Sequence, residues 1–84
     1  MTTQADTTMQ AFILIQAEVG RAAEVARAIG GLPGVVSAED VTGPYDVIVR
    51  VEAADVNALG TLVVATVQNV PGITRTLTCP VVHF

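Results

Sequence analysis

Leu32-Pro33-Gly34-Val35-Val36 and Val70-Pro71-Gly72-Ile73-Thr74 are two stretches of this chain with the same order of residue types. In each stretch, a Pro-Gly pair separates a segment of helical period from a segment of strand period. The two Pro-Gly pairs are 38 residues apart, so the chain reads as one β-α-β unit written twice. The repeat predicts an α+β fold with the order β-α-β-β-α-β, the split β-α-β or ferredoxin-like arrangement.

Six elements follow from the periodicity around these turns. Residues 11–17 are apolar at both odd and even positions, which predicts a central strand that is covered above and below. Asp55 is the predicted N-cap of the second helix. The predicted elements are a strand over 11–17, a helix over 20–29, strands over 35–42 and 45–53, a helix over 55–69 and a strand over 73–82.

The predicted topology leaves one face of the sheet without a cover. Right-handed crossovers give an antiparallel four-stranded sheet in the order 4-1-3-2, with the central pair expected to be the exception, and both helices on one face. The chain is 51% hydrophobic over only 84 residues, and a chain of this size buries only about 60% of its unfolded surface. We therefore expect the bare face to form a sheet-to-sheet homodimer, or a higher oligomer built from it.

Composition and charge exclude several classes of protein. Residues 1–9 are polar and lack an apolar period, which predicts a disordered tail and a single domain over residues 10–84. The chain has four isolated arginines and eight acidic residues, which gives a net charge of −4. Direct nucleic-acid binding needs clustered basic residues and is therefore not expected. No leader or membrane-length apolar run is present, so no membrane contact and a cytoplasmic location are expected.

The residue types that carry catalysis are scarce in this sequence. His83 is the only histidine and adjoins the C-terminal residue, and Cys79 is the only cysteine. No set of His, Cys or carboxylate residues has metal-ligand spacing, and no glycine-rich phosphate loop follows a strand. We therefore expect no catalytic residue, no metal, no cofactor and no enzymatic activity.

Two motifs do suggest a ligand site. In the first, Thr42-Gly43-Pro44-Tyr45-Asp46, the Asp46 carboxylate could bind an ammonium group while free backbone N–H groups bind a carboxylate; the alternative is simply a tight turn. In the second, Thr74, Thr76 and Thr78 are predicted to share one strand face, as a row of hydroxyls that suits a zwitterion. The alternative there is ordinary β-propensity.

At these residues the chain resembles the effector domain of the Lrp/AsnC (feast/famine) regulators, called the RAM domain for regulation of amino-acid metabolism. The resemblance rests on residues 42–49, on the second helix and on residues 71–78, and it extends over residues 10–84. It implies binding of an amino acid or a similar small effector between subunits, and assembly of sheet-to-sheet dimers into larger rings. By motif match, the residues that it assigns to the ligand are Gly43, Tyr45, Asp46, Thr74, Thr76 and Thr78.

The predicted sheet favours a site shared between subunits. Strand 1 separates strand 3, which Asp46 begins, from the threonine-bearing strand 4, a distance of about 10 Å. A neighbouring subunit could therefore supply the other half of the site. Family regulators also carry an N-terminal helix-turn-helix domain, whereas this sequence begins with a short polar tail. We expect a stand-alone RAM domain that modulates transcription by associating with itself or with full-length Lrp/AsnC regulators.

Two other interpretations of the same element order remain open. Small dimeric ferredoxin-like barrel enzymes of the monooxygenase or isomerase type have this order, but they need a His, Trp, Asn or metal inside the barrel. The chain has no Trp and only the terminal His83. ACT-type amino-acid-binding domains have a similar topology, although they are usually fused to an enzyme.

Overall fold

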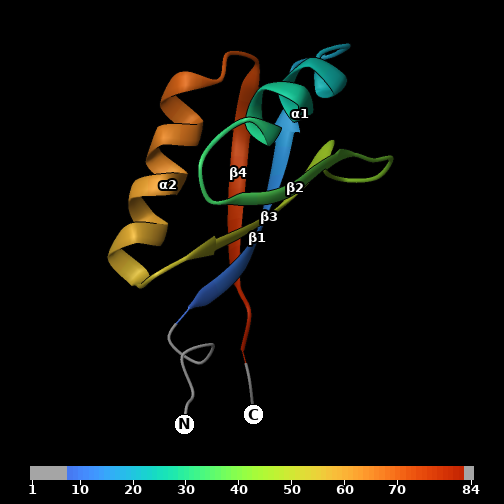
Figure 1. Cartoon of the computed structure of the whole chain (residues 1–84). Coiled ribbons are helices and arrows are strands. Elements are labelled where there is room, and N and C mark those ends of the chain that lie inside the picture. The colour runs from blue at the N-terminus through green and yellow to red at the C-terminus, as the bar shows by residue number, and fades with distance from the viewer. Residues whose placement is uncertain (1–7, 83–84) are drawn as a thin grey trace, which may run out of the picture.

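The structure, a computed structural model, describes residues 8–82 and has the six elements in the predicted order (Figure 1). Predictions for His83 and for most of the 1–9 tail lie outside the described residues. The first strand begins at Met9, two residues earlier than predicted. The elements are β1 (Met9–Ala17), α1 (Ala22–Gly30), β2 (Val35–Asp40), β3 (Val47–Ala53), α2 (Val56–Asn69) and β4 (Ile73–Pro80).

The strand order in the sheet is β2-β3-β1-β4, which confirms the predicted 4-1-3-2 arrangement. The expectation of a parallel central pair is wrong, because β1 and β3 are antiparallel like the other two pairs. The reason is topological. The crossover through α1 makes β1 and β2 parallel, and the hairpin makes β2 and β3 antiparallel, so β3 must run opposite to β1.

The core lies between the sheet and the two helices. Ala11, Ile13 and Ile15 of β1 are at most 1% exposed. They pack in one buried cluster with Val25 and Ile29 of α1, together with residues of β3 and α2. Each fully buried Val or Ile contributes about 1.5–3 kcal/mol relative to exposure. Because both helices contribute to this cluster, they cover the same face of the sheet (Figure 1).

The opposite side of the sheet, which we call the open face, is not covered by any element within residues 8–82. Phe12 of β1 is 37% exposed there, so the predicted cover on both faces of the central strand is present on one face only. The strand registers place twelve side chains on the open face: Gln10, Phe12, Leu14 and Gln16 of β1, Ser37 and Glu39 of β2, Ile48, Arg50 and Glu52 of β3, and Arg75, Leu77 and Cys79 of β4.

The two helices begin differently. As predicted, Asp55 caps α2, and its Oδ1 accepts a hydrogen bond of 2.8 Å from the Ala58 N–H. Helix α1 has no such side-chain cap at Arg21.

Neither of these described helices is long and apolar enough to cross a membrane.

The repeated Pro-Gly pairs form turns of matching backbone conformation. Gly34 has a φ of +86° and Gly72 a φ of +97°, values that disfavour any residue with a Cβ. A Cβ on Gly34 would also lie 3.2 Å from the Glu52 carbonyl oxygen, and one on Gly72 would lie 3.2 Å from the Arg21 Nε. The repeat in the sequence is thus a repeat in the structure, because each turn requires glycine at the point where the chain passes from helix to strand.

Alanine at Gly34 is expected to lower the free energy of unfolding by about 1–2 kcal/mol, because of the positive φ and the close Glu52 carbonyl. Gly60→Ala is the matched control. Gly60 lies within α2 with open space around it, so alanine there should stabilise the protein by about 0.5–1 kcal/mol. Urea unfolding at one fixed protein concentration measures both. Equal effects of the two substitutions would contradict the assigned turn conformation.

Candidate functional site

Asp46 closes the loop between β2 and β3 and attaches it to the end of β1. Its Oδ2 accepts a hydrogen bond of 2.8 Å from the Ala17 N–H. Its own N–H donates to the Ile15 carbonyl, and its carbonyl accepts from the Val41 N–H, both at 2.8 Å. The residue is half-buried. Asp46 therefore has a clear structural role, because its backbone and side chain fix the loop against β1.

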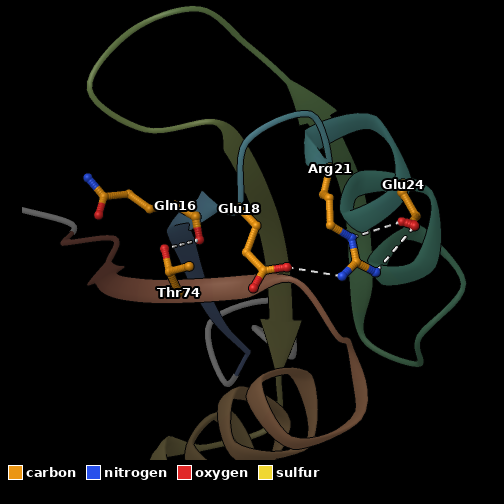
Figure 2. Close-up of polar contacts among 5 residues, drawn as sticks. All are labelled: Gln16, Glu18, Arg21, Glu24 and Thr74. Atoms are coloured by element: carbon orange, nitrogen blue, oxygen red, sulfur yellow. Dashed lines mark hydrogen bonds and ion pairs between the residues drawn. The ribbon is translucent and has the colours of Figure 1, made fainter.

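Thr74 holds the same part of β1 from the other side. The Thr74 Oγ1 donates a hydrogen bond of 3.1 Å to the Gln16 carbonyl, as Figure 2 shows. The Gln16 carbonyl and the Ala17 N–H belong to one peptide group, which we call the Gln16–Ala17 peptide. Asp46 thus binds the N–H of this peptide and Thr74 binds its carbonyl. Both residues lie at the end of the sheet where β1 finishes at Ala17. The backbone segments that carry them are about 10 Å apart across β1, and their side chains reach toward the peptide that lies between them.

The predicted row of threonines is interrupted. A β-bulge shifts the register of β1 and β4, so that Ala17 pairs with Ile73 and Gln16 with Arg75. Thr74 is the extra residue between those two pairs. Thr76 and Thr78 lie opposite Ile15 and Ile13, on the face that the helices cover, and both are half-buried. A strict two-residue alternation does not hold across the bulge, so Thr74 does not continue the row formed by Thr76 and Thr78.

The rest of the first motif forms an exposed loop. Gly43 has a φ of +153° and is exposed, and Tyr45 is half-buried. Within residues 8–82, the structure records no hydrogen-bond acceptor for the N–H groups of Thr42, Gly43 or Tyr45. Backbone N–H groups without an acceptor in the protein are suitable partners for a carboxylate.

Sequence reasoning missed a second set of contacts at this end of the molecule. The Gln16 side chain donates through Nε2 to the Pro44 carbonyl at 3.0 Å and so holds the loop of the first motif. Arg21 pairs with two carboxylates, with Nη1 3.0 Å from Glu18 Oε1 and Nε 3.1 Å from Glu24 Oε1 (Figure 2). The spacing of three residues on either side of Arg21 was the signal that could have predicted this ion-pair cluster.

The Arg21 cluster joins the loop before α1 to the turn before β4. The guanidinium lies against Gly72, and the Glu18 N–H donates to the Gly72 carbonyl at 2.8 Å. The hydrogen bonds that Arg21 donates, to Glu24 first and then to Glu18, raise the pKa of Arg21 above its ordinary value. Arg21 therefore stays charged at any physiological pH, and the cluster ties the start of β4 to the end of β1.

This end of the sheet offers hydrogen-bond acceptors that a polar ligand could use. Asp46 Oδ2 is used by the Ala17 N–H, while Oδ1 has no hydrogen-bond partner among residues 8–82. That oxygen is an acceptor for an ammonium group, and Thr74 Oγ1 can still accept a hydrogen bond after donating one. No group of three or more His, Cys, Asp or Glu residues in the described part of the chain could hold a metal ion.

Comparison with known proteins connects this architecture to one family. The family model described as the Lrp/AsnC ligand-binding domain matches residues 10–83. The solved structure of a protein from Thermus thermophilus is 33% identical and has a TM-score of 0.83. The alignment covers 90% of this chain and 95% of that one.

Two regulators are also similar to this chain. An uncharacterized HTH-type transcriptional regulator from Pyrococcus furiosus is 33% identical over 55 residues, which are 66% of this chain and 37% of that protein. This chain thus corresponds to much less than two thirds of the curated relative that it matches. The structure of a transcriptional regulator from Neisseria meningitidis in complex with L-Met has a TM-score of 0.79 at 23% identity. The alignment covers 99% of this chain and 56% of the regulator. It shows that the two proteins share a fold.

A double-mutant cycle tests whether Asp46 and Thr74 act on one peptide. Asp46→Ala and Thr74→Val should each lower the free energy of unfolding by about 1–2 kcal/mol, because each removes a hydrogen bond to the Gln16–Ala17 peptide. The double variant should lose less than the sum, by about 0.5 kcal/mol or more, because one loosened end weakens the other bond.

Thr76→Val provides the control for this cycle. The Thr76 hydroxyl has no recorded hydrogen bond within residues 8–82, so its removal should change stability by less than about 0.5 kcal/mol. Its effect should add to that of Asp46→Ala. Chemical denaturation at fixed protein concentration measures all the variants, and strict additivity of Asp46→Ala with Thr74→Val would show that the two side chains act independently.

Proposed function

The chain belongs to the family of Lrp/AsnC ligand-binding domains, and from this premise we propose that it is an oligomeric sensor that binds an amino acid between subunits and modulates transcription. The observation that carries the proposal is that only one of the two carboxylate oxygens of Asp46 accepts a hydrogen bond from the described residues. One oxygen fixes the end of β1, and the other has no partner among residues 8–82. A rigidly held acceptor next to free loop N–H groups suits both charged ends of a zwitterion.

The related proteins support the same class of function. The structure of the Neisseria meningitidis regulator is that of its complex with L-Met, and the part of it that aligns with this chain has the same fold. That protein and the Pyrococcus furiosus relative are both named as transcriptional regulators. These names favour the binding-module hypothesis over the hypothesis of a small barrel enzyme.

The open face supports a dimer as the basic unit. Ile48 and Leu77, 36% and 47% exposed, flank Leu14 in one row across β3, β1 and β4, and Phe12, 37% exposed, is the diagonal neighbour of both. Contiguous exposed apolar side chains of this kind mark an interaction surface. A second copy that packs its own open face on this one buries them in both chains.

The ligand site itself extends beyond one subunit in this proposal. Asp46 and Thr74 lie on opposite sides of β1, and Thr76 and Thr78 lie on the helix-covered side of β4. The buried Ile13 and Ile15 of β1 lie between Asp46 and the row of Thr76 and Thr78, so one small zwitterion does not reach both in the same chain. We therefore assign the ammonium contact to Asp46 of one subunit and the hydroxyl contacts to Thr74, Thr76 and Thr78 of a neighbour, with Gly43 and Tyr45 in the loop beside the ligand.

The proposed regulatory step is a change of assembly. A ligand that bridges two subunits stabilises their contact by its binding free energy, so its concentration shifts the oligomer equilibrium. Association of such an oligomer with full-length Lrp/AsnC regulators would carry that signal to transcription.

Asp46→Asn tests the ligand site. If Asp46 binds an ammonium group, the neutral side chain should weaken binding of the responding amino acid about ten- to a hundredfold, because charge-assisted hydrogen bonds contribute about 1.5–3 kcal/mol. A thermal-shift screen of the twenty amino acids identifies the ligand, and calorimetry then compares the two proteins. Because the Asn amide oxygen can still accept from the Ala17 N–H, the fold should be kept.

Asp40→Asn is the charge-matched control for this experiment. Asp40 is exposed at the end of β2 and outside the proposed site, so its substitution should leave the affinity unchanged. Equal affinities of the wild type and Asp46→Asn would show that the Asp46 carboxylate has only the structural role seen at Ala17.

Light scattering tests the proposed dimer. At micromolar concentration the wild type should be a dimer or a larger even multiple. Leu77→Asp should give monomers, because it places a charge in the apolar row of the open face next to Leu14, where Leu77 is 47% exposed. Val64→Asp is the control, since Val64 is 52% exposed on α2 and should not affect the dimer. A folded monomeric wild type would refute the assembly.

A further inference from the structure

The open face carries equal numbers of positive and negative side chains, although the chain as a whole has a net negative charge. The face bears Glu39, Arg50, Glu52 and Arg75, two residues of each sign, whereas the chain has a net charge of −4. A surface with equal numbers of both charges around an apolar centre can complement itself in a two-fold pair.

Arg50 is the charge nearest the middle of this face, and its side chain contacts two residues of β1. Its guanidinium carbon lies 5.6 Å from the centroid of the Phe12 ring on β1. Its Nη2 donates to Gln10 Oε1, also on β1, at 3.0 Å. Within residues 8–82, the ion pairs are those of Arg21, so Arg50 has a cation–π contact and a neutral acceptor but no carboxylate.

Glu39 is the acidic residue that shares a hollow with Arg50. In the register of β2 and β3, Ser37 faces Arg50 and Glu39 faces Ile48, so Glu39 and Arg50 are diagonal neighbours. Both line a hollow of about 390 Å³ on the open face, with Phe12 and Ile48 among the other lining residues. Glu52 lies at the other end of β3 and lines a separate hollow with residues that include Gly34 and Val35.

Covering the open face changes the electrostatics of this hollow. A second copy removes water from the Arg50 guanidinium, and an arginine that is desolvated without an anion is strongly unfavourable. The chain does not bring its own Glu39 to Arg50, although the two side chains stand diagonally on adjacent strands. An anion brought by the covering molecule would offset the cost of removing water from Arg50.

We propose that Arg50 of one copy pairs with Glu39 of a second copy, and that the reciprocal pair forms at the two-fold-related position. This pairing rests on the proposed sheet-to-sheet dimer and specifies its register. Phe12 holds the guanidinium over the middle of the sheet, where the edge strand β2 of the other copy can reach it. The apolar centre gives the contact its area, and the two ion pairs select one alignment of the sheets.

Charge reversal tests this pairing in the full chain. Arg50→Glu and Glu39→Arg should each weaken the homodimer by at least about tenfold, because each places like charges opposite one another. Mixed in equal amounts, the two variants should form heterodimers in preference to either homodimer, since the heterodimer restores complementary pairing. Native mass spectrometry with one chain isotope-labelled measures the proportions. The double variant Arg50→Glu/Glu39→Arg should recover the homodimer.

Glu52→Arg is the matched control, with the same charge change on the same face but outside the hollow of Arg50. Mixed with Arg50→Glu, it should give no preference for the heterodimer. A wild-type dimer whose variants mix statistically would overturn the Arg50–Glu39 pair and leave the dimer itself intact. A monomeric wild type would overturn both. Circular dichroism of each variant confirms that the fold is kept, and heterodimer formation is itself a test that both chains are folded.

Discussion

The position of β1 at the centre of the sheet is the constraint on which the rest of the structure depends. β1 pairs with β3 along one edge and with β4 along the other, so its register fixes which side chains of both neighbours face the helices. Ala11, Ile13 and Ile15 are buried because α1 and α2 pack on that side. A slip of one residue would expose these side chains and bury Phe12 and Gln16 instead, and the apolar core would be lost.

The end of the same strand organises the candidate site. The β-bulge at Ala17 interrupts regular pairing with β4, and a side chain from each flanking segment binds the Gln16–Ala17 peptide there. Arg21 and Gln16 attach two further loops to the same place. These loops therefore share one point of attachment, and in the proposed function it is there that a bound ligand would act on them.

The alternation of β1 that builds the core also creates the open face. Every second residue of the strand faces away from the helices, and one chain has no element left to cover that side in its described part. Phe12 illustrates the consequence, because its ring remains accessible and supports the Arg50 guanidinium. The proposed ligand site and the proposed dimer surface therefore both depend on one strand: the first on its end, the second on its uncovered face.

The sequence by itself determined the element order, the strand order and the two glycine turns. Local periodicity, the Asp55 cap and the Pro-Gly repeat depend only on neighbouring residues, and crossover handedness is a general rule. It also pointed to Asp46 and Thr74, but not to their shared peptide. Only the tertiary structure decided that Thr74 leaves the threonine row, that Arg21 rests on Gly72, and that Arg50 leans over Phe12. A bulge and contacts between distant segments depend on how the strands and loops meet in space, and no local pattern in the sequence records this.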